Sequence, residues 1–163
     1  LRHQLVPEQK LLDYIIEMLE TVGLRPGTTF AEKFPHEMSG VERQRVAIAR
    51  ALSLGPDLII ADEPTSMLDV SIRMEILEIF ARMRIEKNLT IIFITHDLAS
   101  ARYLTDRIIV LQHGSIVEQG IAEDLIRSPK EEYTKQLIKA ASPGWLKSLS
   151  FNNNTKDKDV NHV

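Results

Sequence analysis

Two short aliphatic runs on either side of a helical pattern constrain the fold of this sequence more than any other feature. The runs span Asp57 to Ala61 and Thr90 to Thr95, and both are bounded by helix breakers and too short for a buried helix. Between them, Ser71 to Lys87 has apolar residues at helical spacing. A strand–helix–strand unit of this kind makes its strands parallel, so we expect both strands to be buried and both faces of the sheet to be covered.

Helical patterns flank this unit on both sides. An amphipathic pattern from Glu8 to Val22, stopped by Gly23, predicts one helix, and Ser39 begins a second of about a dozen residues that Gly55-Pro56 ends. The remaining predicted elements are a loop with a helical turn, a short helix, a hairpin turning at His113-Gly114 and two terminal helices, over residues 24–38, 97–104, 108–119, 122–127 and 131–141. The expected fold class is α/β, with a parallel sheet core, a helical subdomain and a C-terminal antiparallel hairpin.

Composition narrows the possible partners. The 163 residues are 44% hydrophobic, carry a net charge of −3 and include no cysteine. The small negative charge gives no electrostatic reason to expect nucleic acid as a partner, and the lack of cysteine excludes a disulfide framework or a thiolate metal site. No apolar run in the sequence approaches the roughly 20 residues that span a bilayer, and the polar stretch after Leu149 has too little apolar surface to fold.

Two adjacent carboxylates follow the first aliphatic run. A parallel strand would place Asp62 and Glu63 at its carboxyl end, where α/β sheets bind their ligands. An isolated pair of this kind is as often structural, because acidic residues also end strands and cap the next helix. In a functional site the two acids divide the work: one holds the magnesium ion that bridges two phosphates, and the other orients or deprotonates the attacking water.

The segment from Pro35 to Leu52 favours the functional interpretation. Its sequence, PHEMSGVERQRVAIARAL, resembles the signature loop and helix of ATP-binding cassette (ABC) ATPases. A capping box of Ser39 and Glu42 would satisfy the free amides of the helix N-terminus, and the two interpretations are compatible. A serine hydroxyl and close backbone amides at such a terminus can also bind an anion such as a γ-phosphate. The resemblance implies that Ser39, Gly40 and Glu42 face the nucleotide.

Further segments resemble other motifs of this family and follow in the same order and at similar spacing. The resemblance covers about residues 8 to 140. Leu58 to Glu63 resembles the Walker B strand, Ser66 to Asp69 the D-loop, and Thr95-His96-Asp97 the switch loop. The resemblance implies a partial P-loop NTPase fold with ATP and Mg²⁺ as cofactors. The implied magnesium ligand, general base, γ-phosphate contact and further nucleotide contact are Asp62, Glu63, His96 and Asp69. The expected parts are a helical subdomain, an ATPase core, C-terminal helices and a disordered tail, over residues 1–54, 55–121, 122–149 and 150–163.

The last third of the chain favours transport. Residues 106–120 resemble the C-terminal hairpin of transporter ATPases, and residues 129–140 resemble the tail of the dipeptide, oligopeptide and nickel importer branch. An amphipathic terminal helix explains that tail equally well. The resemblance implies the ATPase subunit of an importer for a small solute, with peptides as the expected cargo. Its implied partners are a second ATPase subunit and transmembrane permease subunits, which would hold it at the cytoplasmic face of the cell membrane.

Two departures from the family pattern limit this expectation. The sequence contains no Gly-x-x-x-x-Gly-Lys-Ser/Thr loop, so we expect that loop to precede Leu1, the chain alone to be inactive, and core surface to be exposed. Val41 and Glu42 stand where the signature usually has glycine and glutamine, and the bulk of Val41 restricts the approach of a phosphate. A second hypothesis is therefore a non-catalytic module that pairs with a complete ATPase. A third, an ABC ATPase of DNA repair or translation, is disfavoured by the charge and the transporter-like hairpin.

Overall fold

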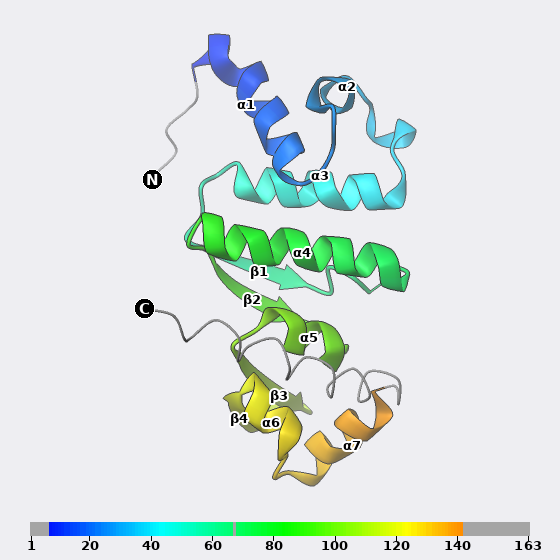
Figure 1. Ribbon diagram of the computed structural model, residues 1–163, viewed down its shortest axis with the longest axis vertical. Helices are drawn as coiled ribbons and strands as arrows, with labels where there is room; N and C mark the ends of the chain where they lie inside the picture. Colours follow the sequence, from blue (N-terminus) through cyan, green and yellow to red (C-terminus); the bar gives the residue numbers. More distant parts are fainter. Residues whose placement is uncertain (1–6, 67, 142–163) are drawn as a thin grey trace, which may run out of the picture. The chain divides into compact units, whose positions relative to one another are not determined.

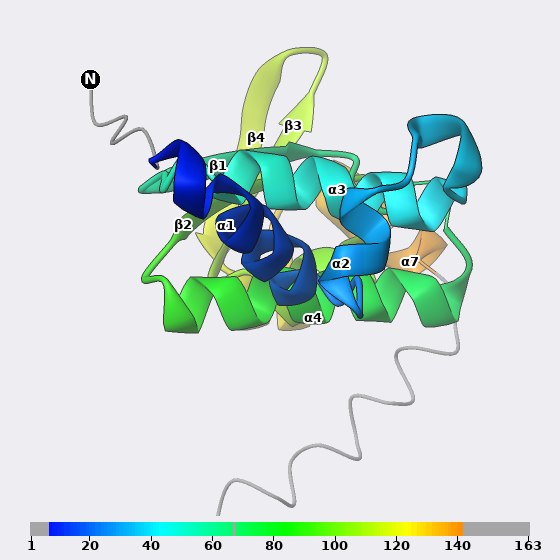
Figure 2. The same cartoon turned by 90° about the horizontal axis from the view of Figure 1, so that it is seen from above.

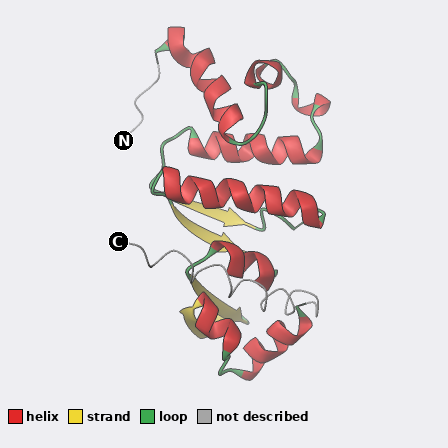
Figure 3. Cartoon of the chain, viewed as in Figure 1, coloured by secondary structure: helices red, strands yellow, loops and turns green. Residues whose placement is uncertain are grey.

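The computed structural model describes residues 7–66 and 68–141, and its elements confirm the predicted α/β class (Figure 1 and Figure 3). The chain divides into two compact units, one ending at Ile94 and one beginning at Thr95. The described elements of the first unit are α1 Glu8–Thr21, α2 Gly27–Ala31, the 3₁₀ helix η1 Pro35–Glu37, α3 Gly40–Leu52, β1 Leu58–Asp62, α4 Val70–Glu86 and β2 Thr90–Ile94. Those of the second unit are α5 Leu98–Leu104, β3 Arg107–Gln112, β4 Ser115–Ile121, α6 Ala122–Arg127 and α7 Glu132–Ala140.

The strand–helix–strand unit forms as predicted, because β1 and β2 pair in parallel on either side of the crossover helix α4. Leu58 lies opposite Thr90 at one end of the pair, and Asp62 lies opposite Ile94 at the other. In Figure 1 both strands run in one direction, and α3 and α4 run in the opposite direction. The carboxyl ends of the two strands therefore lie at the same edge of the sheet.

The prediction that both strands are buried, with both faces of the sheet covered, is wrong for the described residues. One face is covered, and there Phe93 meets Phe80 of α4 edge-to-face with ring centroids 6.1 Å apart. Alternate apolar residues point to the other face, where they are 46–63% exposed: Leu58, Ile60, Ile92 and Ile94. Within the first unit the described helices cover only one side of the pleat, so every second residue of each strand stays exposed. Exposed core surface of this kind was itself expected from the missing loop segment.

The helical part of the first unit is held together at the end of α1. Gly23, with φ of +82°, ends this helix as predicted, and the preceding Val22 is fully buried. Arg45 of α3 donates from Nη1 to the Val22 carbonyl at 2.8 Å, and Arg82 of α4 donates to the Thr21 carbonyl. In the view of Figure 2, α1 crosses both α3 and α4. Two arginines thus satisfy carbonyl groups that the end of a helix leaves without partners.

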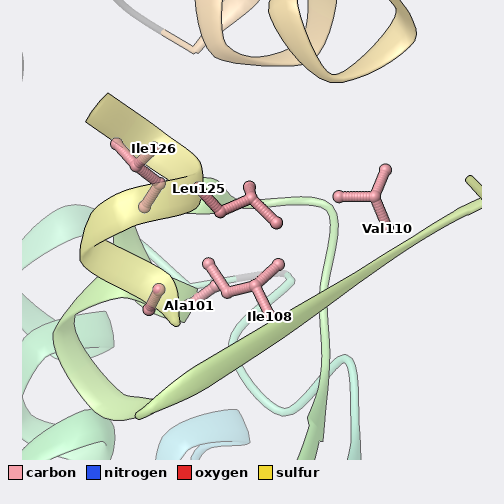
Figure 4. Packing of buried hydrophobic residues seen from close by; sticks show 6 residues of the cluster. Ala101, Ile108, Val110, Leu125 and Ile126 are labelled. Carbon is pink, nitrogen blue, oxygen red and sulfur yellow. The ribbon is translucent and has the colours of Figure 1, made fainter. Parts of the chain in front are cut away.

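The second unit is built on the predicted hairpin. β3 and β4 pair antiparallel with a register shift between Val110 and Leu111, and His113 and Gly114 form the turn with φ of +50° and +78°. Positive φ at both central residues is typical of a two-residue hairpin turn. One face of the hairpin packs against α5 and α6 in an apolar cluster (Figure 4), which consists of Ala101, Ile108, Val110, Ala122, Leu125 and Ile126.

The predicted helices are confirmed, with ends that differ from the prediction by one or two residues. The two terminal helices are α6 and α7, and the loop over 24–38 contains α2 and η1. The four-part division of the chain stays a prediction, since its tail at 150–163 and the end of its third part lie outside the described residues. Within the described residues, no helix combines the length and the apolar character needed to cross a membrane.

Candidate functional site

The two predicted carboxylates lie at the carboxyl end of β1. Asp62 is the last residue of the strand and is exposed, and Glu63 follows it with φ of +47°. The Glu63 N–H donates to the Ile94 carbonyl of β2 at 2.9 Å, and the Glu63 carbonyl accepts from the N–H and the hydroxyl of Ser66 at 3.3 and 3.1 Å. A left-handed backbone is unfavourable for glutamate, so these hydrogen bonds hold Glu63 in a conformation it seldom adopts.

Ser39 and Glu42 form the predicted capping box at the N-terminus of α3. The Ser39 hydroxyl accepts from the Glu42 N–H at 3.2 Å, and the Glu42 carboxylate accepts from the Ser39 N–H at 2.6 Å. Lys33 adds an ion pair with the same carboxylate at 3.3 Å. The Ser39 N–H and then its hydroxyl, followed by Lys33, lower the pKa of Glu42. The carboxylate of Glu42 is therefore ionised and already engaged by its own chain.

Gly40 and Val41 lie between Ser39 and Glu42, and they differ in the space around them. A Cβ atom added to Gly40 would meet no other atom within 4 Å, and Gly40 is exposed. The packing of this chain does not explain a glycine in the first turn of a helix, where it is less favourable than alanine. A glycine there would allow close approach of a ligand to the backbone, as the prediction for Gly40 requires. Val41 beside it is half-buried, and its branched side chain adds bulk at the same turn.

Asp69 lies at the N-terminus of the crossover helix. Its side chain accepts from the Ile72 N–H at 3.0 Å and caps α4. Asp69 is exposed, and the predicted nucleotide contact would have to use the same carboxylate. The structure therefore gives Asp69 a structural role, and its role toward a nucleotide stays a prediction.

His96 belongs to the second unit, two residues after the last residue of β2. It is exposed and lies at a bend between β2 and α5, where its neighbours make several hydrogen bonds. The Thr95 hydroxyl accepts from the Asp97 N–H at 3.0 Å, and the Asp97 carboxylate accepts from the Ala99 N–H at 3.0 Å and from the hydroxyl of Ser100 at 2.5 Å. These bonds cap α5 and hold the backbone on both sides of the histidine. Ser39, Gly40, Glu42, Asp62, Glu63 and Asp69 all belong to the first unit.

Asp62 offers a single exposed carboxylate to the predicted magnesium ion. Among the residues that the structure describes, no group of three or more histidine, cysteine, aspartate or glutamate side chains could hold a metal ion. Magnesium commonly takes only one or two protein carboxylates and completes its shell with water and substrate phosphates. A single exposed carboxylate at the end of a parallel strand meets that requirement.

Gln44 joins two parts of the site and was not predicted. Its side chain donates from Nε2 to the carbonyl of Pro64 at 2.6 Å and so links α3 to the residue after Glu63. A signal was present in the sequence. Gln44 lies at helical spacing from Ala47, Ile48 and Ala51, so it is a polar residue on the small, apolar side of the helix.

Comparison with known proteins shows similarity over most of the chain. A family model described as "ABC transporter" matches residues 2–66. The oligopeptide transport ATP-binding protein OppF of Bacillus subtilis (strain 168) is 45% identical over 139 residues, which are 85% of this chain and 45% of the relative. The dipeptide transport ATP-binding protein DppF of Haemophilus influenzae is 41% identical over 126 residues, 77% of this chain and 38% of the relative. The chain thus spans less than half the length of these relatives.

A solved structure supports the fold. It is described as an inward-facing conformation of a metal-chelate type ABC transporter, and it is 26% identical with a TM-score of 0.63. The similarity covers 69% of this chain and 43% of the other. These comparisons bear on the fold and the family, and the roles predicted for single residues stay predictions.

Proposed function

Because this chain belongs to the ABC transporter ATP-binding family, we propose that it works as the ATP-binding ATPase subunit of an importer. The proposal depends above all on three features in sequence order: the capped helix N-terminus at Ser39, the strand-end carboxylates Asp62 and Glu63, and His96 just after the next strand. The relatives named for oligopeptide and dipeptide transport support peptides as the transported solute.

Each site residue has one role in this proposal. Glu63 is the general base that orients or deprotonates the water attacking the γ-phosphate. Asp62 holds magnesium, which neutralises charge on the phosphates when it is bound. His96 contacts the γ-phosphate. The remaining nucleotide contacts are made by Ser39, Gly40, Glu42 and Asp69.

The backbone at Glu63 supports its role as the base. Its N–H is bound to β2, and its carbonyl is bound within the turn to Ser66. A group whose backbone is fixed before the substrate arrives loses little freedom in reaching the reacting geometry. A general base of this kind contributes about 10²- to 10⁴-fold to the rate.

The proposal places the phosphate-binding loop outside these 163 residues, which contain no Gly-x-x-x-x-Gly-Lys-Ser/Thr. Its partners are a second ATPase subunit and transmembrane permease subunits. The permease subunits hold the protein at the cytoplasmic face of the membrane and receive the energy of ATP hydrolysis.

A second candidate function is a non-catalytic module that pairs with a complete ATPase. Val41 favours it, because a branched side chain stands next to Gly40 in the turn that should face the phosphate. The engagement of the Glu42 carboxylate by Ser39 and Lys33 also favours it, since that group is not free for a ligand.

ATP hydrolysis by the native gene product, assembled with its permease, tests the proposal. We expect magnesium-dependent turnover, and we expect Glu63→Gln to lower kcat by about 10²-fold or more because an amide cannot accept the proton. Glu86→Gln is the matched control, since it makes the same chemical change at an exposed position near the end of α4, and it should leave kcat unchanged.

Two outcomes would overturn the proposal. One is an assembled wild-type protein without magnesium-dependent turnover. The other is equal turnover in wild type and Glu63→Gln. If Glu63→Gln leaves the rate unchanged while the chain raises or lowers the rate of a partner ATPase, the non-catalytic module is the better account.

A further inference from the structure

The hydrogen bond between Gln44 and Pro64 connects two segments that lie twenty residues apart in the chain. Gln44 is in the second turn of α3, five residues after Ser39, and its Nε2 lies 2.6 Å from the Pro64 carbonyl. Pro64 directly follows Glu63 and is buried. One side chain therefore joins the helix that begins at the Ser39–Glu42 cap to the turn that carries Glu63.

The side chains around this bond are mostly apolar. It lies beside a cavity of about 140 Å³, whose lining includes Ile48, Ala61 and Phe80. Of the described residues that line the cavity, Gln44 alone has a polar side chain. The bond is part-buried, and a hydrogen bond in apolar surroundings is stronger than one in water, so losing the donor removes a favourable contact of the Pro64 carbonyl.

Hydrogen bonds of different origin hold the backbone at Glu63 and Pro64. Its N–H is bound to the Ile94 carbonyl of β2, and its carbonyl is bound to Ser66 in the same turn. The next carbonyl along the chain, that of Pro64, is bound to Gln44 of α3. The bond from Gln44 joins this turn to the helix whose N-terminus is proposed to face a nucleotide. A shift of α3 is therefore passed to the backbone beside Glu63.

We propose that Gln44 is a positioning residue, which holds the backbone of Glu63 in place for catalysis and couples it to the Ser39–Glu42 end of α3. This inference rests on the proposed function, because that function makes Glu63 the general base. In this role Gln44 acts on the backbone of Glu63 and not on the nucleotide or the attacking water. It acts through the left-handed conformation of Glu63, which the surrounding hydrogen bonds must maintain.

Solution NMR on the full 163-residue chain tests the structural part. Gln44→Leu keeps the size of the side chain but removes the donor, and it should shift the Pro64 carbonyl carbon and the Thr65 amide. Ser53→Ala is the matched control, because it removes another side chain that donates to a backbone carbonyl, Arg50, at the far end of α3. We expect it to leave the Pro64 and Thr65 signals at their wild-type positions. Unchanged signals in Gln44→Leu would overturn the inference.

A second variant separates loss of the bond from loss of the fold. In Gln44→Glu the introduced carboxyl can donate to the Pro64 carbonyl only when it is protonated. The Pro64 and Thr65 signals should therefore be shifted at neutral pH and return toward the wild-type positions as the pH falls through the pKa of the introduced carboxyl, which apolar surroundings raise above the usual value of about 4.3. A shift that does not respond to pH would mean that Gln44 only fills space, and it would overturn the inference.

ATP hydrolysis by the native gene product with its permease tests the catalytic part. Gln44→Leu should lower kcat by about tenfold to a hundredfold, as expected for a displaced catalytic group, with KM for ATP unchanged. Ser53→Ala should keep the wild-type kcat. A wild type that turns over while Gln44→Leu keeps full kcat overturns this inference alone. A wild type without turnover instead overturns the proposed function and the role of Gln44 within it.

Discussion

Glu42 and Glu118 each accept hydrogen bonds from backbone N–H groups at a helix N-terminus. Their partners, however, lie at different distances along the chain. Glu42 accepts from the N–H of Ser39, three residues before it in the same turn. Glu118 on β4 accepts from the N–H groups of Lys130 and Glu131 at 2.9 and 3.2 Å, at the turn that begins α7. These two residues lie 12 and 13 positions further along the chain than Glu118.

Both carboxylates have a lowered pKa, for similar physical reasons. The pKa of Glu42 is lowered first by the Ser39 N–H and then by the Ser39 hydroxyl. The pKa of Glu118 is lowered first by the hydroxyl of buried Thr134, although that hydroxyl makes no full hydrogen bond within the described residues, and then by the Lys130 N–H. The cap at Glu42 forms with the helix itself, whereas the cap at Glu118 forms only when β4 and α7 have come together. A local cap should therefore stabilise one turn, and a distant cap should stabilise the docking of an element.

Gly23 combines a local and a distant constraint, and we expect its replacement to have the largest effect. An alanine there must adopt φ of +82°, and its Cβ would lie 2.4 Å from Nη1 of Arg45. We expect Gly23→Ala to lower the free energy of unfolding by about 2 to 3 kcal/mol, from backbone strain together with the loss of the bond between Arg45 and Val22. Urea unfolding measures this difference.

Gly55→Ala is the control that separates the two constraints. Gly55 also has positive φ, at +59°, but a Cβ there meets nothing within 4 Å. It should lose only the strain of the left-handed backbone, about 1 to 2 kcal/mol. Equal losses for the two variants would show that the contact of Gly23 with distant Arg45 adds nothing.

The distant cap is tested by Glu118→Ala. Two N–H groups at the start of α7 lose a charged acceptor, so we expect α7 to detach more readily and the free energy of unfolding to fall by about 1.5 to 2 kcal/mol. Amide hydrogen exchange in α7 and urea unfolding measure the two effects. Glu132→Ala removes a carboxylate of the same helix that is 75% exposed and, among the described residues, forms an ion pair with Lys135, and it should cost less than about 0.5 kcal/mol. Unchanged exchange in α7 of Glu118→Ala would contradict the comparison.

The local cap is tested by Ser39→Ala. The Glu42 N–H loses its acceptor, and the loss of an N-cap side chain of this kind costs about 1 kcal/mol. Faster amide exchange should stay within the first turn of α3. Ser53→Ala, at the other end of the same helix, should leave that turn protected. Faster exchange throughout the first unit would mean that this cap stabilises more than its own turn.

The same contrast explains which parts of the fold could be predicted from the sequence. The capping box at Ser39, the stop at Gly23 and the turn at His113-Gly114 depend on residues a few positions apart, and the structure confirms all three. The parallel pairing of the strands followed from their length and the helix between them. Burial of both sheet faces was predicted wrongly, because coverage depends on which distant elements pack there and not on the apolar character of the strand.

The features of the candidate site also divide into those that the sequence predicts and those that depend on contacts between distant residues. Patterns in the sequence placed Asp62 and Glu63 at a strand end, and the structure has them there. The sequence did not predict that Asp69 caps α4. The left-handed backbone of Glu63 and its link to Gln44 were not predicted, because they join residues from separate elements. The roles of Asp62, Glu63 and Asp69 toward magnesium, water and nucleotide stay predictions. The nucleotide contacts of Ser39, Gly40, Glu42 and His96 also stay predictions.

The smallest expected effect is on the pH dependence of stability. Because the pKa of Glu42 and that of Glu118 are lowered in the folded chain, each ionised carboxylate stabilises the fold above about pH 4.3, and this contribution is lost as the pH falls through the folded-state pKa. We expect Glu118→Gln to reduce the fall in the free energy of unfolding at acidic pH more than Glu42→Gln does. The reason is that the linkage depends on the pKa difference between folded and unfolded states, and contacts over three residues persist in part when the chain unfolds. Urea unfolding between pH 3 and 7, the range about the unperturbed glutamate value, measures the slopes. An equal reduction by both variants would mean that local and distant caps are equally absent from the unfolded chain.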